Sequence, residues 1–245
     1  MRTRGVMPPV LRYNRGRKGG IRLHGYTIKA VIFRYLLLCV GLAIMALGVA
    51  FSIRASLGTS PISSVPYVIS LISPLSVGTA TILMHCVFIL IQIFILRRRY
   101  ELIQLMQLPV ALIFGFMCDF ALWMLQGVSY GSYLQQWLLC LIGIVLVAIG
   151  VFLEVSADVV VLAGEGVSLA ICKVLPIRFS SMKVIFDVTL VLIACVLGFG
   201  FTGSLQGVRE GTIAAAVLVG MLVRAISKWK DALQRRFRKN DGRHG

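Results

Sequence analysis

The sequence is poor in acidic residues and in histidine, on which many enzymes and metal sites depend. It holds nine Asp and Glu and three His among 245 residues. Two of the histidines, His24 and His244, lie near the chain ends, so Cys and His do not cluster at metal-ligand spacing. The motifs H-E-x-x-H, G-x-S-x-G and G-x-x-x-x-G-K-[ST] are also missing. These absences predict a protein that is not an enzyme, with no catalytic residues, no metal and no cofactor.

Paired cysteines are missing as well. The six cysteines stand singly, and no two of them form a C-x-x-C motif. Most lie inside apolar runs, where a cysteine behaves as a small hydrophobic residue. We therefore expect packing residues, with neither disulfides nor metal ligands among them.

Apolar residues dominate what is present. They make up 58% of the chain, and the mean hydropathy is +0.91. A bilayer core is crossed by roughly 20 apolar residues in a helix. Six segments reach this length, at 33–53, 77–96, 104–125, 135–153, 182–201 and 211–227. The pattern predicts an all-α, polytopic membrane protein with six transmembrane helices.

The basic residues give this bundle an orientation. Of 25 Lys and Arg, 20 lie in the first 34 residues, at Arg97–Arg99 and from Arg224 onwards. Six crossings place all three groups on one side, and such an excess marks the cytoplasmic side. We expect both termini to be cytoplasmic and these charges to contact anionic lipid headgroups. The tails carry no folded basic module with aromatic residues for stacking bases, which argues against a nucleic-acid partner.

The chain divides into a membrane domain with two tails. Residues 1–32 form a basic tail that we expect to be disordered, residues 33–227 the transmembrane domain, and residues 228–245 a second basic tail. Within the domain, "GLAIMALGVAF" aligns with "GIVLVAIGVFL", "LGTSPIS" with "LAGEGVS", and "LSVGTATILM" with "FSSMKVIFDV", each about one hundred residues apart. The alignment predicts one repeat over about 33–125 and another over about 135–227.

Three crossings in each repeat would place the second copy upside down relative to the first. Two shorter apolar stretches, Ile62–Ile72 and Val159–Val174, are interrupted by Pro66 and by "GEG". They are too short or too broken to cross a bilayer. We therefore expect two inverted three-helix repeats, each with a short broken or re-entrant helix, as in many secondary transporters.

Several of these segments carry a family resemblance. "LAGEGVSLAI", "KVIFDVTLVLIA", "GVREGTIAAAVLVG" and "RASLGTSPISSVPYVIS" followed by "SVGT" resemble the YczE branch of the YczE/YyaS/YitT-type bacterial membrane proteins. The resemblance covers about residues 33–226. It implies a multi-pass protein of the bacterial cytoplasmic membrane with a suspected transport role.

The breaks at Gly58–Pro66 and Gly164–Ser168 hold the main candidates for binding a substrate or ion. They contribute Gly58, Thr59 and Ser60 from the first repeat, and Gly164, Glu165, Gly166 and Ser168 from the second. Glycine leaves backbone amides accessible, and a carboxylate at membrane depth is costly unless it has a purpose. The alternative for Glu165 is a solvated loop tip.

Further candidates are ionisable residues in or beside the spans. Lys183 and Asp187 share one helical face and either form a structural ion pair or exchange protons. Arg209 and Glu210 open the sixth span and either mark the interface or border an anion site. The remaining two are Asp119, a candidate for a proton relay, and Arg54, which could pair with Asp119 or hold an anionic substrate.

These features favour a transporter or permease-like protein for a small solute or ion, with its site formed by the broken helices. Because no nucleotide-binding motif is present, an ion or substrate gradient or a separate energising partner would supply the drive. The alternative is a non-transporting membrane protein that scaffolds or regulates a partner complex. Homo-oligomerisation is left open by the sequence.

Overall fold

The computed structural model describes residues 28–203 and 207–241. These described residues are 84% helix and contain no strand. The helices are α1 (Ile28–Ala55), α2 (Pro61–Ile72), α3 (Val77–Leu96), η2 (Arg97–Arg99), η3 (Leu102–Met106), α4 (Gln107–Met124), α5 (Tyr133–Ala157), α6 (Ala163–Val174), α7 (Phe179–Thr202) and α8 (Glu210–Asp241). Of the N-terminal tail that was predicted to be disordered, residues 1–27 lie outside the described residues, and residues 28–32 form the start of α1. The C-terminal tail is helical up to Asp241.

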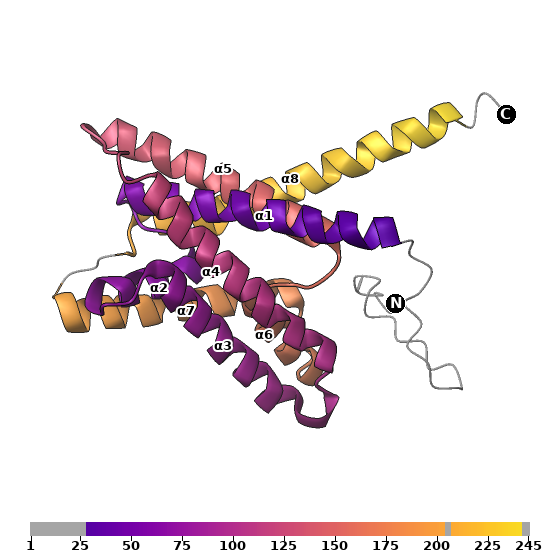
Figure 1. Cartoon of the computed structure of the whole chain (residues 1–245), viewed down its shortest axis with the longest axis horizontal. Coiled ribbons are helices and arrows are strands. Elements are labelled where there is room, and N and C mark those ends of the chain that lie inside the picture. The colour runs from indigo at the N-terminus through magenta and orange to yellow at the C-terminus, as the bar shows by residue number, and fades with distance from the viewer. Residues whose placement is uncertain (1–27, 204–206, 242–245) are drawn as a thin grey trace.

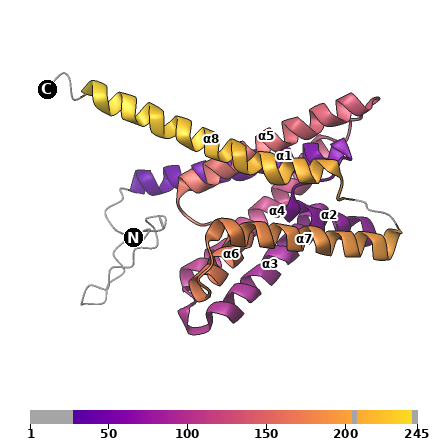
Figure 2. The same ribbon diagram turned by 180° about the vertical axis from the view of Figure 1, so that it is seen from behind.

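The six predicted spans are confirmed as helices. Those long and apolar enough to cross a membrane are Val31–Ala55, Val77–Arg99, Leu102–Met124, Tyr133–Ala157, Phe179–Thr202 and Glu210–Lys230. The chain enters α1 and leaves α8 on the same side of the molecule (Figures 1 and 2). An even number of crossings requires this arrangement.

Helices α1 and α5 pack antiparallel through glycines, in the same half of the molecule as α8 (Figure 1). A Cβ atom added at Gly48 would lie 2.7 Å from the carbonyl oxygen of Gly143. Two helical turns further along α5, a Cβ at Gly150 would lie 2.7 Å from the carbonyl oxygen of Gly41. Small residues permit such close approach of two backbones, the usual way in which membrane helices gain packing energy.

Helices α2 and α6 have 12 residues each. At 1.5 Å per residue each is about 18 Å long, too short for a hydrocarbon core of about 30 Å. The predicted interruption by Pro66 is wrong, because α2 continues through this residue. Its missing N–H costs one hydrogen bond, to the carbonyl of Ile62. The predicted break at Gly164–Gly166 is also displaced: the chain breaks at 158–162, and "GEG" lies in the first turn of α6.

The connections after the short helices set their direction. Only residues 73–76 separate α2 from α3, and residues 175–178 separate α6 from α7. Each short helix therefore ends beside the start of the next long helix and begins towards the interior. There the side chain of Ile62 in α2 contacts Gly164 in α6. A buried apolar cluster from α2, α3, α6 and α7 surrounds this contact, with Val65, Phe88 and Phe186 among its members.

Candidate functional site

The first turns of α2 and α6 meet, and neither start has a side-chain cap. The residues preceding them, Ser60 and Leu162, make no side-chain capping hydrogen bond. The first amides of a helix lack partners within the helix, and the aligned peptide dipoles place partial positive charge there. Two such ends face the same region from different parts of the chain. This arrangement can bind a polar or anionic group.

Glu165, Lys183 and Asp187 are brought together beside this point. Lys183 Nζ lies 2.7 Å from Asp187 Oδ1 on the first turns of α7, with both side chains partly exposed. Glu165, half-buried in the first turn of α6, lies within electrostatic reach of both. Burial raises the pKa of the Glu165 carboxyl above its ordinary value, while the Lys183 charge opposes and the Asp187 charge adds to this shift. The group combines two acids and a base.

Glu154 belongs to the same group but is absent from the sequence-based candidates. Its side chain is 2% exposed near the end of α5, and its Oε1 accepts a hydrogen bond from the amide of Leu162 at 2.8 Å. Its charged neighbours are Glu165 and Lys183. The sequence does contain a signal for Glu154, because this carboxylate directly follows the predicted span 135–153. An ionisable residue beside a membrane span has a high free-energy cost and therefore indicates a functional role.

Two buried glutamines hold the start of α6. Gln92 of α3 donates through Nε2 to Gln107 Oε1 of α4 at 2.9 Å and to the carbonyl oxygen of Ala163 at 3.1 Å. A Cβ at Gly166 would lie 2.6 Å from Gln92 Oε1. The backbone of Gly166 is helical, so glycine here gives room for the Gln92 side chain and does not make a bend. Ser168, one turn further along α6, is fully buried, and its Oγ has no hydrogen-bond partner among the described residues.

The predicted residues of the first repeat lie against the start of α8. Gly58 has φ +92°, and a Cβ there would clash with the Thr212 hydroxyl and lie 2.7 Å from the amide nitrogen of Arg209. Thr59 is buried, and its amide donates to the carbonyl of Gly207 at 3.4 Å. Ser60 Oγ donates to Ser63 Oγ at 3.0 Å. This loop is a buried polar segment packed against another helix start.

Arg209 and Glu210 form an exposed ion pair at that helix start. Arg209 Nη2 lies 3.2 Å from Glu210 Oε1, and Nη1 donates to the carbonyl of Ser56 at 3.1 Å. The Tyr133 hydroxyl also donates to Glu210 Oε1, at 3.2 Å. These contacts join α8 to the end of α1 and the start of α5.

Asp119 and Arg54 are not paired with each other. Asp119 accepts from the Ser76 hydroxyl at 2.6 Å and from the Gly78 amide at 2.7 Å, and so caps the start of α3. Arg54 Nη2 donates instead to the carbonyl of Leu122 at 3.1 Å. Asp119 therefore has a structural contact that accounts for its charge, whereas Arg54 has no carboxylate partner among the described residues.

The described residues contain no group of three or more His, Cys, Asp and Glu side chains that could hold a metal. The six cysteines are unpaired, as expected for packing residues. His85 is 1% exposed, and its ring packs edge-on against Phe88 and Phe114. The ionisable side chains beside the meeting point of α2 and α6 are therefore Glu154, Glu165, Lys183 and Asp187.

Comparison with known proteins adds a family to this description. A family model described as "Family of unknown function (DUF6198)" matches residues 32–228, which include all six spans except residue 31 of the first and residues 229–230 of the last. No curated protein and no solved structure matches the chain. The family match covers most of the chain, and the chain therefore belongs to the Family of unknown function (DUF6198).

Proposed function

We propose that this protein is a transporter or permease for a small polar solute or ion, with its site at the meeting point of the first turns of α2 and α6. The observation that carries the proposal is the contact between Ile62 and Gly164, which brings together two uncapped helix starts. Discontinuous helices whose ends meet inside a bundle are the usual binding element of secondary transporters.

Contacts between α1 and α5 support the inverted-repeat organisation in this proposal. In the aligned repeats, Gly41 corresponds to Gly143 and Gly48 to Gly150. The close pairs are Gly41 with Gly150 and Gly48 with Gly143. Each glycine thus meets the counterpart of the other, as contacts across a two-fold axis must. Because the helices are antiparallel, this axis would lie in the membrane plane.

The contacts of the remaining helices are also equivalent when the two repeats are exchanged. Helix α1 packs on α4 as α5 packs on α8, and α2 packs on α7 as α6 packs on α3. Each short helix therefore contacts a long helix of the other repeat as well as its own neighbour. We propose that α2 and α6 are re-entrant, entering from opposite sides of the membrane.

The chemistry of the site favours a polar solute recognised by backbone amides and a carboxylate. Glu165 and the unpartnered Ser168 hydroxyl lie in the first two turns of α6. The neighbouring Lys183–Asp187 pair and Glu154 offer a route for a coupled proton. No nucleotide-binding motif is present in the chain, so a gradient or a separate partner would supply the energy.

We further propose the bacterial cytoplasmic membrane as the location, with both termini cytoplasmic, in agreement with the resemblance to the YczE branch. In this orientation Arg97–Arg99 and the basic end of α8 meet anionic headgroups on one side. A second copy of the chain or an energising partner would dock within the membrane.

The experiment is a ligand screen on purified full-length protein, read as a rise in unfolding temperature. We compare the wild type with Glu165→Gln, and use Glu101→Gln, at an exposed residue in the linker before η3, as the matched control. A solute that stabilises the wild type and Glu101→Gln but not Glu165→Gln is the expected result. Flux of that solute into vesicles should likewise be present with the wild type and Glu101→Gln and lost with Glu165→Gln.

Two outcomes would contradict the proposal. If a Glu165→Gln, Asp187→Asn double variant keeps full stabilisation by the solute and full flux, these two residues do not belong to the site. The scaffold alternative would be favoured if Glu165→Gln has no effect while substitutions on the lipid-facing surface of α7 abolish capture of a partner protein.

A further inference from the structure

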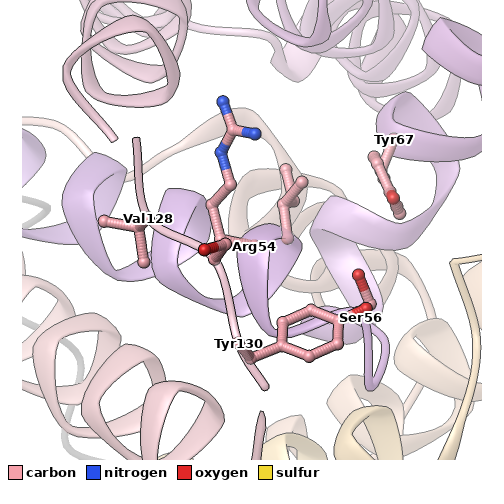
Figure 3. Close-up of a pocket in the computed structure, with 7 residues that line it drawn as sticks. Arg54, Ser56, Tyr67, Val128 and Tyr130 are labelled. Carbon is pink, nitrogen blue, oxygen red and sulfur yellow. The ribbon is translucent and has the colours of Figure 1, made fainter. Parts of the chain in front are cut away.

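A second polar region, separate from the meeting of α2 and α6, surrounds Arg54 at the end of α1. A cavity of about 490 Å³ opens here between the end of α1, the middle of α2 and the loop before α5. Arg54 lies between Val128 on one side and Tyr67 on the other, with Ser56 and Tyr130 below it (Figure 3). Ser129 also lines the cavity.

Arg54 has no carboxylate partner among the described residues. Its Nη2 donates to the carbonyl of Leu122 at 3.1 Å, while its Nε is buried with no hydrogen-bond partner in the part of the chain that the structure describes. By contrast, Arg34 lies 3.4 Å from Asp158 and Arg209 lies 3.2 Å from Glu210. A half-buried guanidinium without a counter-charge is costly, so the cavity is electrostatically incomplete without an anion.

The other polar groups around the cavity are hydroxyls, and none of its described lining residues is acidic. Burial raises the pKa of the Tyr67 phenol; Tyr130 adds to this shift and the Arg54 charge opposes it. Tyr67 therefore stays protonated and able to donate. Arginine presents a planar set of N–H donors that matches the oxygens of a carboxylate or phosphate, and hydroxyls supply further donors.

We propose that this cavity binds a small oxyanion, a carboxylate or phosphate group, held by the Arg54 guanidinium and the Tyr67 hydroxyl. The group would belong either to a free solute or to the headgroup of an anionic lipid. Binding at this cavity does not depend on the proposed transport, because it can be measured on the purified protein in the absence of flux.

The test measures thermal unfolding of full-length protein in a non-ionic detergent with added inorganic phosphate or succinate, against chloride at matched ionic strength. A parallel arm compares nanodiscs of phosphatidylglycerol with nanodiscs of phosphatidylcholine. The variants are Arg54→Gln, Tyr67→Phe and the control Arg178→Gln, which removes the same charge at an exposed residue just before α7.

We expect phosphate or succinate to stabilise the wild type and Arg178→Gln, with affinity at least tenfold weaker in Arg54→Gln and several-fold weaker in Tyr67→Phe. Stabilisation by phosphatidylglycerol alone, lost in Arg54→Gln, would identify the anion as a lipid headgroup. The proposal is overturned if no anion and no anionic lipid stabilises the wild type. It is also overturned if Tyr67→Phe and a folded Arg54→Gln bind as the wild type does. Tyr67→Phe keeps the test decisive should Arg54→Gln fail to fold.

Discussion

Substituting Gly48 by alanine tests the packing of α1 against α5. The added methyl group would lie 2.7 Å from both the Gly143 carbonyl oxygen and the Val147 amide nitrogen. Ordinary van der Waals contact begins near 3.4 Å, so α1 and α5 must separate by about 0.7 Å. Both obstacles are backbone atoms and cannot rotate away. Forced overpacking of this kind costs about 1–3 kcal/mol.

The control for this change is Gly220→Ala in α8. A Cβ at Gly220 would meet nothing within 4 Å. Both substitutions gain about 1 kcal/mol from the better helix propensity of alanine, so the difference between the two variants isolates the clash. We expect Gly48→Ala to be less stable than Gly220→Ala by about 1–3 kcal/mol.

The assay is reversible unfolding in mixed micelles of dodecylmaltoside and dodecyl sulfate, followed by circular dichroism. Gly143→Ala should lose a similar amount, because a Cβ there would lie 2.7 Å from the Gly48 carbonyl oxygen. Equal stability of Gly48→Ala and Gly220→Ala would refute the close packing of α1 against α5.

Three further substitutions have defined outcomes. Asp119→Ala removes the acceptor for two groups at the start of α3 and should lower the free energy of unfolding by about 0.5–2 kcal/mol, measured in the same micelles. Gln92→Leu leaves the buried Gln107 amide without its partner and should cost about 1–3 kcal/mol in that assay, whereas a neutral effect would contradict the buried hydrogen bonds. Lys183→Met should destabilise the protein, and adding Asp187→Leu should restore part of the loss in a double-mutant cycle; additive effects would show that the two charges are not coupled.

The helical crossings were predictable because apolar length alone determines them. Every predicted span corresponds to a long apolar helix, with bounds that differ by a few residues. The glycines in the aligned "GLAIMALGVAF" and "GIVLVAIGVFL" also indicated the interface that the structure has, since two small residues seven apart share one helix face.

The detail of the short helices was less predictable. Glycine and proline are typical of helix breaks, but Pro66, Gly164 and Gly166 all lie within helices. What these glycines provide is room: Gly164 accommodates Ile62, and Gly166 accommodates Gln92. A sequence shows which positions are small, but which neighbour requires the space depends on tertiary packing.

The candidate site was predicted in part for the same reason. Spacing in the chain joined Lys183 to Asp187, because they are four residues apart on one helix. It could not show that Glu154 reaches the start of α6, since seven residues of helix end and irregular chain lie between it and Leu162. It also offered a pairing of Arg54 with Asp119, whose nearer partners prove to be the Ser76 hydroxyl and the Gly78 amide.

The most direct test of the central claim is the sidedness of two exposed prolines that follow the short helices. Pro74 lies between α2 and α3, and Pro176 between α6 and α7. Each is replaced by cysteine in a background without native cysteines and labelled in membranes of known orientation with an impermeant maleimide. Re-entrant helices in inverted repeats predict that Pro74→Cys reacts only from the periplasmic side and Pro176→Cys only from the cytoplasmic side. Labelling of both from the same side would contradict the claim.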